Sequence, residues 1–321
     1  MRLVGKRKSR LRVSAAESSS RQKGADPGKA VPGDRFLLQS RVGSGGMCEV
    51  LSAVDLQRVE YGDLRPAVAL KRLLPEFAHQ RQAQCALARE YFTLRHLAHP
   101  GIIRAFDLHC EEWGLCFSME LLEGSSAHAE LGAHPLGLGS AGISFGARIL
   151  DTLAYLHSQG VAHGDVKPAN IFLEQGGRVV LLDFNVAHAS DRPGTAGAKV
   201  ARGLAGRMGL SGMSLLHAAP ERLGGASPAP PGDVFSASCT TYEMITGHHP
   251  YRMLSAKEAA ASGLRPERPA ALSHRQWREL RRGLSFDPHT RPTARQLCAA
   301  LCSHGWLGRI RLALSGCGAG K

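Results

Sequence analysis

Residues 163–170 read HGDVKPAN and place three side chains suited to acid–base and ion chemistry within eight positions. Asp165 supplies a carboxylate, Lys167 an amine and Asn170 a carboxamide. Such a run can arise by accident, and it can also form most of a centre for phosphoryl transfer. Gly164 stands where such centres often carry an arginine. The rest of the chain decides between these two interpretations.

Three further stretches contain residues that suit the binding of a phosphorylated ligand. VGSGGMCEV holds Gly43 and Gly45 in a predicted strand–turn–strand, where backbone N–H groups can approach phosphates because no side chain intervenes. A glycine pair alone is weak evidence, since turns use glycine constantly. VALK ends in Lys71, and LLDFNVA contains Asp183. The order of these stretches along the chain carries more weight than any one of them.

The elements that must position these residues fall into two groups. In the first, alternating apolar residues begin a strand in PGDRFLLQSRV, and residues 42–53 and 66–73 predict further strands. The stretch 82–103 contains helix-forming residues, with apolar side chains at helical spacing. It predicts a helix that ends at Pro100. GLCFSMELLEG predicts a strand that runs into a connector. This part of the chain is expected to be a small β-rich unit with one main helix.

After Gly124 the pattern becomes helical. Residues 144–157 place apolar side chains on one helical face, and residues 233–246 are apolar on nearly every side, which predicts a buried helix. Two short apolar pieces, 170–173 and 179–182, flank EQGGR and predict a hairpin. The sequence therefore predicts an α+β fold of two lobes joined near residue 122, a small β-rich N-lobe and a larger helical C-lobe.

Composition places the chain in an ordinary globular class. Its 321 residues are 43% hydrophobic and 21% charged. No apolar run approaches the roughly 18–20 residues that a membrane-spanning helix needs. The N-terminus lacks the apolar core of a secretory signal, although its Arg and Ser content leaves an organelle transit peptide open. The eight cysteines show no metal-ligand spacing, which predicts reduced thiols and a cytoplasmic location.

Positive charge is concentrated at the N-terminus. The formal net charge is +13, and residues 1–33 contain nine Lys and Arg against two acids. Their low hydrophobic content predicts a basic disordered tail. This tail is either merely solvated or a segment that attracts a polyanionic partner, such as nucleic acid, anionic lipid or an acidic protein. Residues 304–321 are expected to form a short C-terminal tail.

Taken in this order, the motifs resemble those of Ser/Thr protein kinases over roughly residues 35–303. An H-G-D catalytic loop is common in bacterial protein kinases and fits this Ala-, Gly- and Arg-rich composition. The resemblance implies a protein serine/threonine kinase that uses ATP and Mg²⁺. It also implies a kinase domain over 34–303, with its N-lobe over 34–122 and its C-lobe over 123–303.

The resemblance assigns a nucleotide site to the N-lobe and the hinge. Lys71 would bind the α- and β-phosphates and pair with Glu90, which lies in the family's helix pattern. SMELLEG resembles the hinge, with Met119 as gatekeeper and with the Glu120 carbonyl and the Leu122 amide at the adenine edge. The implied nucleotide-binding residues are Val42, Gly43, Ser44, Gly45, Gly46, Val50, Ala69, Lys71, Met119, Glu120 and Leu122.

The same resemblance assigns the chemistry to HGDVKPAN and LLDFNVA. Asp165 would accept or orient the proton of the substrate hydroxyl, and Lys167 would contact the γ-phosphate, which favours Ser/Thr over Tyr substrates. Asn170 and Asp183 would hold Mg²⁺. The implied reaction is in-line transfer of the γ-phosphoryl group of ATP to a protein hydroxyl, in which positioning and charge neutralisation supply most of the rate.

Other residues are expected to be architectural. Glu221 of HAAPERL would pair with a buried arginine, Arg291, and Asp233 would tie down the backbone of the catalytic loop. His163 is expected to be a packed loop residue. The His248–His249 pair of GHHPY is expected to face solvent.

Three departures from the family pattern bear on activity. Cys48 replaces the third glycine of the phosphate loop, where it is either simply tolerated or a redox sensor. Asn185 replaces the glycine of D-F-G, and asparagine is the residue other than glycine that best accepts a left-handed backbone. Gly164 replaces the arginine that pairs with an activation-segment phosphate, which predicts activity without phosphorylation of that segment. The segment offers the hydroxyls of Ser190, Thr195, Ser211 and Ser214, of which Ser214 is expected to be structural.

Two other functions remain open at this point. A small-molecule kinase of the aminoglycoside or choline type shares the H-G-D loop but lacks Lys167 at this offset, the A-P-E segment and the R-P-T-A box. A pseudokinase scaffold would bind nucleotide without transferring phosphate, although the chain retains every implied catalytic residue. Protein substrates are the expected partners, and Ala169 together with the basic surface hints at acidic or neutral target sites.

Overall fold

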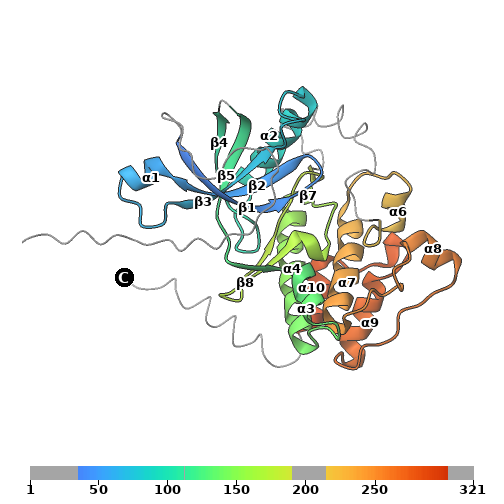
Figure 1. Cartoon of the computed structure of the whole chain (residues 1–321). Coiled ribbons are helices and arrows are strands. Elements are labelled where there is room, and N and C mark those ends of the chain that lie inside the picture. Colours follow the sequence, from blue (N-terminus) through green and yellow to red (C-terminus); the bar gives the residue numbers. More distant parts are fainter. Residues whose placement is uncertain (1–34, 112, 190–214, 303–321) are drawn as a thin grey trace, which may run out of the picture.

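A five-stranded antiparallel sheet forms the N-terminal lobe of the computed structural model, which describes residues 35–111, 113–189 and 215–302 (Figure 1). The order across the sheet is β1-β2-β3-β5-β4. The strands are β1 Phe36–Ser44, β2 Cys48–Asp55, β3 Ala67–Leu73, β4 Ala105–Glu111 and β5 Gly114–Met119. The sheet carries the glycine-containing turn between β1 and β2 and presents Lys71 from β3.

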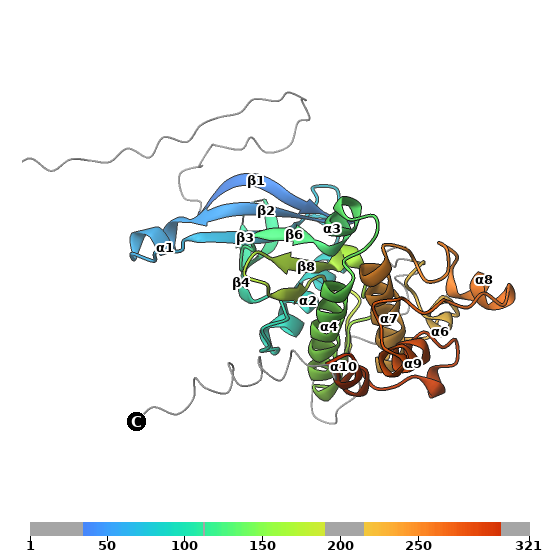
Figure 2. The same ribbon diagram turned by 90° about the horizontal axis from the view of Figure 1, so that it is seen from below.

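Two helices belong to the described part of this lobe. The short α1, Leu56–Glu60, begins at the N-cap Asp55 and lies at the far end of the sheet from the C-lobe in both views (Figures 1 and 2). The longer α2, Arg81–Arg95, packs against the sheet through buried residues that include Leu87, Tyr91 and Leu94. Glu90 lies on the same buried face of α2, so the packing of α2 fixes where this carboxylate points.

Helices dominate the C-terminal lobe. The long α4, Ser140–Ser158, packs against both α7, Pro230–Thr246, and α10, Ala294–Cys302 (Figure 2). Gly146 permits the close approach of α4 to α7, because a Cβ on it would lie 2.3 Å from the side chain of Thr241. The remaining helices among the described residues are α3 Ala127–Ala133, α6 Pro220–Leu223, α8 Ala256–Ala261 and α9 His274–Gly283, with 3-10 turns at Pro168–Asn170 and Pro288–Thr290.

Small sheets lie where the lobes meet. The hairpin of β8, Ile171–Glu174, and β9, Val179–Leu181, adds β6, Gly124–Ser126, to one edge. A second pair joins β7, Val161–Ala162, to β10, His188–Ala189. Leu181 bridges to Ile102 of the N-lobe. These short strands bracket the catalytic loop and the D-F-N stretch, and so fix the two to each other.

The predicted two-lobed α+β architecture is confirmed, with differences at element ends. The expected strand over 42–53 is interrupted by the turn at Gly45–Met47, and β4 was not predicted, because its polar alternation is weak. Helix α2 ends at Arg95 rather than at Pro100, and α7 begins three residues earlier than Asp233, with two prolines in its first turn. The predicted tails, 1–33 and 304–321, lie outside the described residues.

None of the helices in the described ranges combines the length and apolar character needed to cross a bilayer. Among the same residues, none of the seven cysteines forms a disulfide.

Candidate active site

Lys71 lies at the centre of a chain of charges that links the two lobes. Its Nζ is 2.7 Å from Glu90 Oε1 on α2 and 3.1 Å from Asp183 Oδ1 at the start of the D-F-N stretch. Lys71 and Glu90 are both buried, whereas the side chain of Asp183 is 38% exposed. The expected Lys71–Glu90 ion pair is therefore present, and it extends to Asp183.

Opposite charges favour the charged forms of Lys71 and Asp183, whereas burial raises the pKa of Glu90 against the opposing effect of Lys71. Burial alone would lower the pKa of Lys71, but the carboxylates of Glu90 and Asp183 outweigh burial and raise it. Burial also acts to raise the pKa of Asp183, yet the charge and the hydrogen bond of Lys71 bring it below its ordinary value. Glu90 Oε1 accepts from both Lys71 and the backbone N–H of Phe184, while its buried Oε2 has no hydrogen-bond partner among the described residues.

A second cluster forms on the catalytic loop. Lys167 Nζ lies 2.7 Å from Asp165 Oδ2, and Asn170 Nδ2 donates to the same oxygen and to the Asp165 carbonyl, both at 2.9 Å. Asp165 and Asn170 are buried, and the side chain of Lys167 is 21% exposed. Leu182 N donates to the Asn170 carbonyl at 2.8 Å, so this cluster is tied to the strand that leads to Asp183.

Asp233, at the start of α7, holds the backbone of the catalytic loop through hydrogen bonds. Its two carboxylate oxygens accept from the N–H groups of His163 and Gly164, each at 2.8 Å, and His157 Nε2 lies 2.9 Å away. Gly164 has a φ of 81°, and a Cβ on it would lie 3.0 Å from Pro228. An arginine would therefore be strained at Gly164, and the side chain of Pro228 already lies against this position.

The D-F-N stretch differs from the expectation for Asn185. The left-handed residue is Asp183, with a φ of 60°, whereas Asn185 does not have a positive φ. The proposed reason for tolerating Asn185 was therefore wrong. Its side chain instead donates from Nδ2 to Asp183 Oδ1 at 2.5 Å, a bond that glycine could not make. Phe184 is buried and packs edge-on against His163, with ring centroids 4.8 Å apart.

The phosphate loop leaves open space where its glycines lie. A Cβ on Gly46 would meet no atom within 4 Å, and one on Gly45 would come no closer than 3.8 Å to protein. Neither glycine has a positive φ, so the backbone conformation does not require them. Open space above a backbone turn suits a ligand that approaches the N–H groups closely. Ser44 pairs with Glu49 and Gly43 with Val50, which closes the β1–β2 ribbon around this turn.

Cys48 turns into the N-lobe core and is 7% exposed. Burial raises the pKa of its thiol to about 11, against the opposing charge of Lys71 and with smaller contributions in the same direction from the carboxylates of Glu90 and Asp183. A protonated, buried thiol is a poor nucleophile. The structure therefore favours simple packing of Cys48 over the redox-sensor alternative.

The hinge follows β5. Met119 ends that strand opposite Ala69 of β3, and Glu120 N donates to the Arg104 carbonyl at 2.9 Å. Within the described ranges, neither the Glu120 carbonyl nor the Leu122 N–H makes a hydrogen bond to protein. Both groups thus remain available to a planar ligand edge. Val42 at the rim is 54% exposed.

The donor set suits a magnesium ion that is shared with phosphates. Asp183 Oδ2 has no hydrogen-bond partner among the described residues, and the Asn170 amide uses its nitrogen toward Asp165, which leaves Asn170 Oδ1 as a ligand atom. In the described part of the chain no group of three His, Cys, Asp or Glu could hold a metal by itself. Mg²⁺ characteristically takes one or two protein oxygens and completes its shell with water and substrate phosphates. Asp183 and Asn170 fit that pattern.

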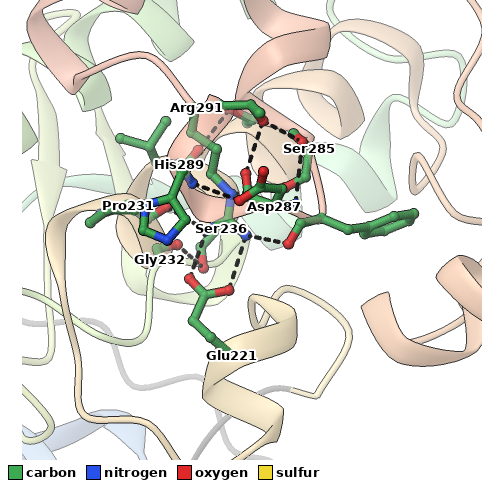
Figure 3. A network of polar contacts seen from close by, with 12 residues as sticks. Glu221, Pro231, Gly232, Ser236, Ser285, Asp287, His289 and Arg291 are labelled. Atoms are coloured by element: carbon green, nitrogen blue, oxygen red, sulfur yellow. Dashed lines mark hydrogen bonds and ion pairs between the residues drawn. The ribbon is translucent and has the colours of Figure 1, made fainter.

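Arg291 forms the centre of a polar network beside α6 (Figure 3). Its guanidinium donates to both carboxylate oxygens of Glu221, at 2.7 and 3.0 Å. It also donates to the carbonyls of Pro231 at 2.9 Å and of Ser285 at 2.8 Å. The expected Glu221–Arg291 pair is present, and it joins three separate segments of the C-lobe.

Two histidine predictions have different outcomes. His163 is fully buried, and its Nε2 donates to the Leu182 carbonyl at 2.9 Å, which agrees with a packed loop residue. His248 is exposed as expected, but His249 is only 6% exposed and its Nε2 contacts the Leu216 carbonyl at 3.0 Å. The prediction that both histidines of GHHPY face solvent was wrong, because Tyr251 and His217 cover His249.

Sequence reasoning missed the side-chain role of Glu120 and its partner Arg178, which precedes β9. Their bidentate pair has distances of 2.8 and 2.5 Å. No local pattern marks the pair, since 58 residues separate its members. Ser190, Thr195, Ser211 and Ser214 lie outside the described residues.

Comparison with known proteins gives a consistent result. The model of the protein kinase domain family matches residues 36–307. The chain is 31% identical to the serine/threonine-protein kinase PkaA of Streptomyces coelicolor, over 84% of this chain and 50% of that protein. It is 28% identical to PknD of Mycobacterium tuberculosis over 73% of this chain, and 26% identical to PrkC of Bacillus subtilis over 76%.

The chain spans about half the length of PkaA and about a third of the length of PknD and PrkC. These curated relatives are all named as bacterial serine/threonine-protein kinases. With a family match over most of its length and a relative above 30% identity, the chain belongs to the protein kinase domain family.

Proposed function

We propose that this chain transfers the γ-phosphoryl group of ATP to Ser or Thr hydroxyls of proteins, with Mg²⁺ as the metal. One observation carries the proposal: Lys71 contacts Glu90 and Asp183 at once, at 2.7 and 3.1 Å. In kinases the lysine–glutamate pair and the metal-binding aspartate must both be in place for transfer. The contacts of Lys71 with Glu90 and Asp183 support the proposal that these residues have those roles in this chain.

Asp165 and Lys167 are the proposed groups at the acceptor side. Asp165 would orient the substrate hydroxyl and take up its proton as the new bond to the γ-phosphorus forms and the bond from that phosphorus to the leaving ADP breaks. Lys167, which is partly exposed beside Asp165, would neutralise charge on the phosphoryl group in transit. The Asn170 amide holds the Asp165 carboxylate by its Oδ2, which fixes the direction of the other oxygen.

Nucleotide binding is proposed for the space between the lobes. The turn formed by Gly43, Ser44, Gly45 and Gly46 would lie over the phosphates, and within it the Gly45 N–H already donates to the Cys48 carbonyl at 2.7 Å. Lys71 would hold the α- and β-phosphates. Val42, Val50, Ala69 and Met119 would line the adenine space, whose polar edge would meet the Glu120 carbonyl and the Leu122 N–H. Asp183 and Asn170 would hold Mg²⁺, which neutralises charge on the β- and γ-phosphates.

The domain limits are proposed as residues 34–303, with a basic segment over 1–33 that binds a polyanionic or acidic partner through charge. Deleting residues 1–33 should leave turnover on a short peptide unchanged, because every proposed site residue lies beyond residue 40. Binding to such a partner should become weaker and less dependent on salt. Equal salt dependence with and without the segment would remove this proposal.

A cytoplasmic location is proposed because the cysteine usage of the sequence suits reduced thiols.

Incubation with γ-labelled ATP and Mg²⁺, followed by phosphosite mapping, tests the activity. Peptide substrates with acidic, neutral and basic flanks should be offered together, with Asp165→Asn as the inactive control. Label on Ser or Thr that is lost in the control supports the proposal. A nucleotide-dependent melting shift without transfer would instead indicate a pseudokinase scaffold. Transfer to an aminoglycoside or to choline would indicate a small-molecule kinase.

A further inference from the structure

All three residues of the D-F-N stretch make contacts within the site. Asp183 accepts from Lys71, Phe184 donates its N–H to Glu90 at 3.2 Å, and Asn185 donates to Asp183 Oδ1 at 2.5 Å. An ionised carboxylate oxygen can only accept, so the amide atom that faces it is the nitrogen. The Asn185 side chain is therefore a donor to Asp183.

The two oxygens of Asp183 have different surroundings. Oδ1 accepts from Lys71 and from Asn185, whereas Oδ2 has no hydrogen-bond partner in the described part of the chain. The side chain is 38% exposed, so a ligand can approach this carboxylate. Two donors on one oxygen restrain the torsions of the carboxylate and leave the other oxygen for an ion.

Asp183 needs this restraint more than most aspartates do. Its backbone is left-handed, with a φ of 60°, and such a conformation persists only where neighbours stabilise it. The backbone of Asn185 does not have a positive φ, so a left-handed conformation does not explain why asparagine stands at this position. The chain contains just two asparagines, Asn170 and Asn185, and each donates its amide to a site carboxylate.

We propose that Asn185 is a positioning residue for the divalent-cation site, whose side-chain N–H holds Asp183 so that Oδ2 is presented to Mg²⁺. The proposal rests on the proposed function, since it concerns the same metal. Partners of a metal ligand that fix its orientation typically change metal affinity by 10–100-fold when they are removed. A glycine at this position has no side chain with which to do this.

A different role for Asn185 would be direct ligation of the ion through its own Oδ1. The two roles predict opposite effects of Asn185→Asp. A carboxylate is the stronger ligand for Mg²⁺, so direct ligation predicts that metal binding is kept or improved. Positioning predicts that it is weakened, because the new carboxylate cannot donate and repels Asp183.

The test is calorimetric binding of ADP to the full chain, with Mg²⁺ and with EDTA. Asn185→Ala removes the donor, Asn185→Asp distinguishes the two roles, and Gln84→Ala is the matched control. Gln84 also donates one amide hydrogen bond, at 2.7 Å to the Ala78 carbonyl, and has no bond to the site residues. In wild type, Mg²⁺ should tighten ADP binding. In both Asn185 variants this gain should fall roughly tenfold. ADP affinity in EDTA should be unchanged in Asn185→Ala, and both affinities should be unchanged in Gln84→Ala.

Each other outcome has a definite meaning. A wild-type Mg²⁺ gain in Asn185→Ala overturns the proposal, and so does equal weakening with and without the metal, which would show a general packing role. A gain at or above wild type in Asn185→Asp would make Asn185 a ligand instead. If wild type itself shows no Mg²⁺ gain, the metal site of the proposed function fails, independently of Asn185. If Asn185→Asp does not fold, Asn185→Ala still shows whether the side chain of Asn185 contributes to metal binding.

Discussion

Arg178 and Glu120 form a bidentate ion pair that ties the hinge to the β8–β9 hairpin, with distances of 2.8 and 2.5 Å. Arg178 Nε also donates to the Pro100 carbonyl at 2.6 Å, and Glu120 accepts from the Arg104 N–H at 2.8 Å. The pair therefore joins the hinge, the hairpin of the C-lobe and the loop after α2. It restrains the same short segment that is proposed to meet the adenine edge.

Arg178→Ala should loosen the hinge and reduce stability. Both side chains are less than a third exposed, and removing a bidentate partner of this kind should cost about 1–2 kcal/mol of unfolding free energy. Hydrogen exchange of residues 119–123 should accelerate. Arg282→Ala is the matched control, because its pair with Glu279 involves a side chain that is 51% exposed and should contribute almost nothing. Equal effects of the two substitutions would show that Arg178 acts only as surface charge.

Lys71→Met should abolish turnover and also destabilise the fold. The substitution leaves Glu90, which is 2% exposed, as a buried carboxylate without its cation, at a cost of about 3–5 kcal/mol. The double variant Lys71→Met with Glu90→Gln should recover most of that stability, since no buried charge is left unpaired, while turnover stays absent. Chemical denaturation of the single and double variants measures this coupling. Additive losses in the double variant would contradict it.

Phosphatase-treated enzyme should keep most of its turnover. Gly164 has no cation to pair with an activation-segment phosphate, and Pro228 lies against that position, 3.0 Å from where a Cβ would be. To test this, protein made in bacteria is treated with a phosphatase, and mass spectrometry verifies that the phosphate has been removed. The turnover of treated and untreated protein is then compared on one peptide substrate. Activity that collapses on treatment and returns on autophosphorylation would show that another residue senses the phosphate.

The ordered motifs predicted much of the site because each is a short pattern whose partner is another short pattern. Lys71 with Glu90, Glu221 with Arg291, and Asp233 with the loop backbone are all of this kind. The contact of Asn185 with Asp183 was not predicted, because asparagine at that position suggested a backbone preference rather than a donor. A prediction of exposure from the sequence also uses only the neighbouring residues, and it cannot take account of distant residues that pack against a side chain. His249 is covered by His217, which precedes it by 32 residues, and only the tertiary structure shows this.

The burial of His249 should make stability depend on pH between about 4 and 6.5. Burial lowers its pKa from 6.5 to about 4, and the neighbouring His217 acts in the same direction, while Glu243 opposes both. The unfolded chain therefore binds a proton in this range that the folded chain does not. Stability due to neutral His249 is present above about pH 6.5 and is lost as the pH falls toward 4, by on the order of 2–3 kcal/mol.

Substituting His249 separates its contribution from that of the carboxylates, which also titrate at low pH. His249→Gln keeps a donor for the Leu216 carbonyl but cannot take up a proton, so its unfolding free energy should fall less steeply than that of wild type from pH 6.5 to 4. His248→Gln, at the exposed neighbour, should retain the wild-type slope. Urea denaturation of the three proteins across this range provides the comparison. If the unfolding free energies of wild type and His249→Gln have the same slope against pH, the folded protein does not disfavour the charged form of His249. The contact with His217 would then leave protonation of His249 possible in the folded state.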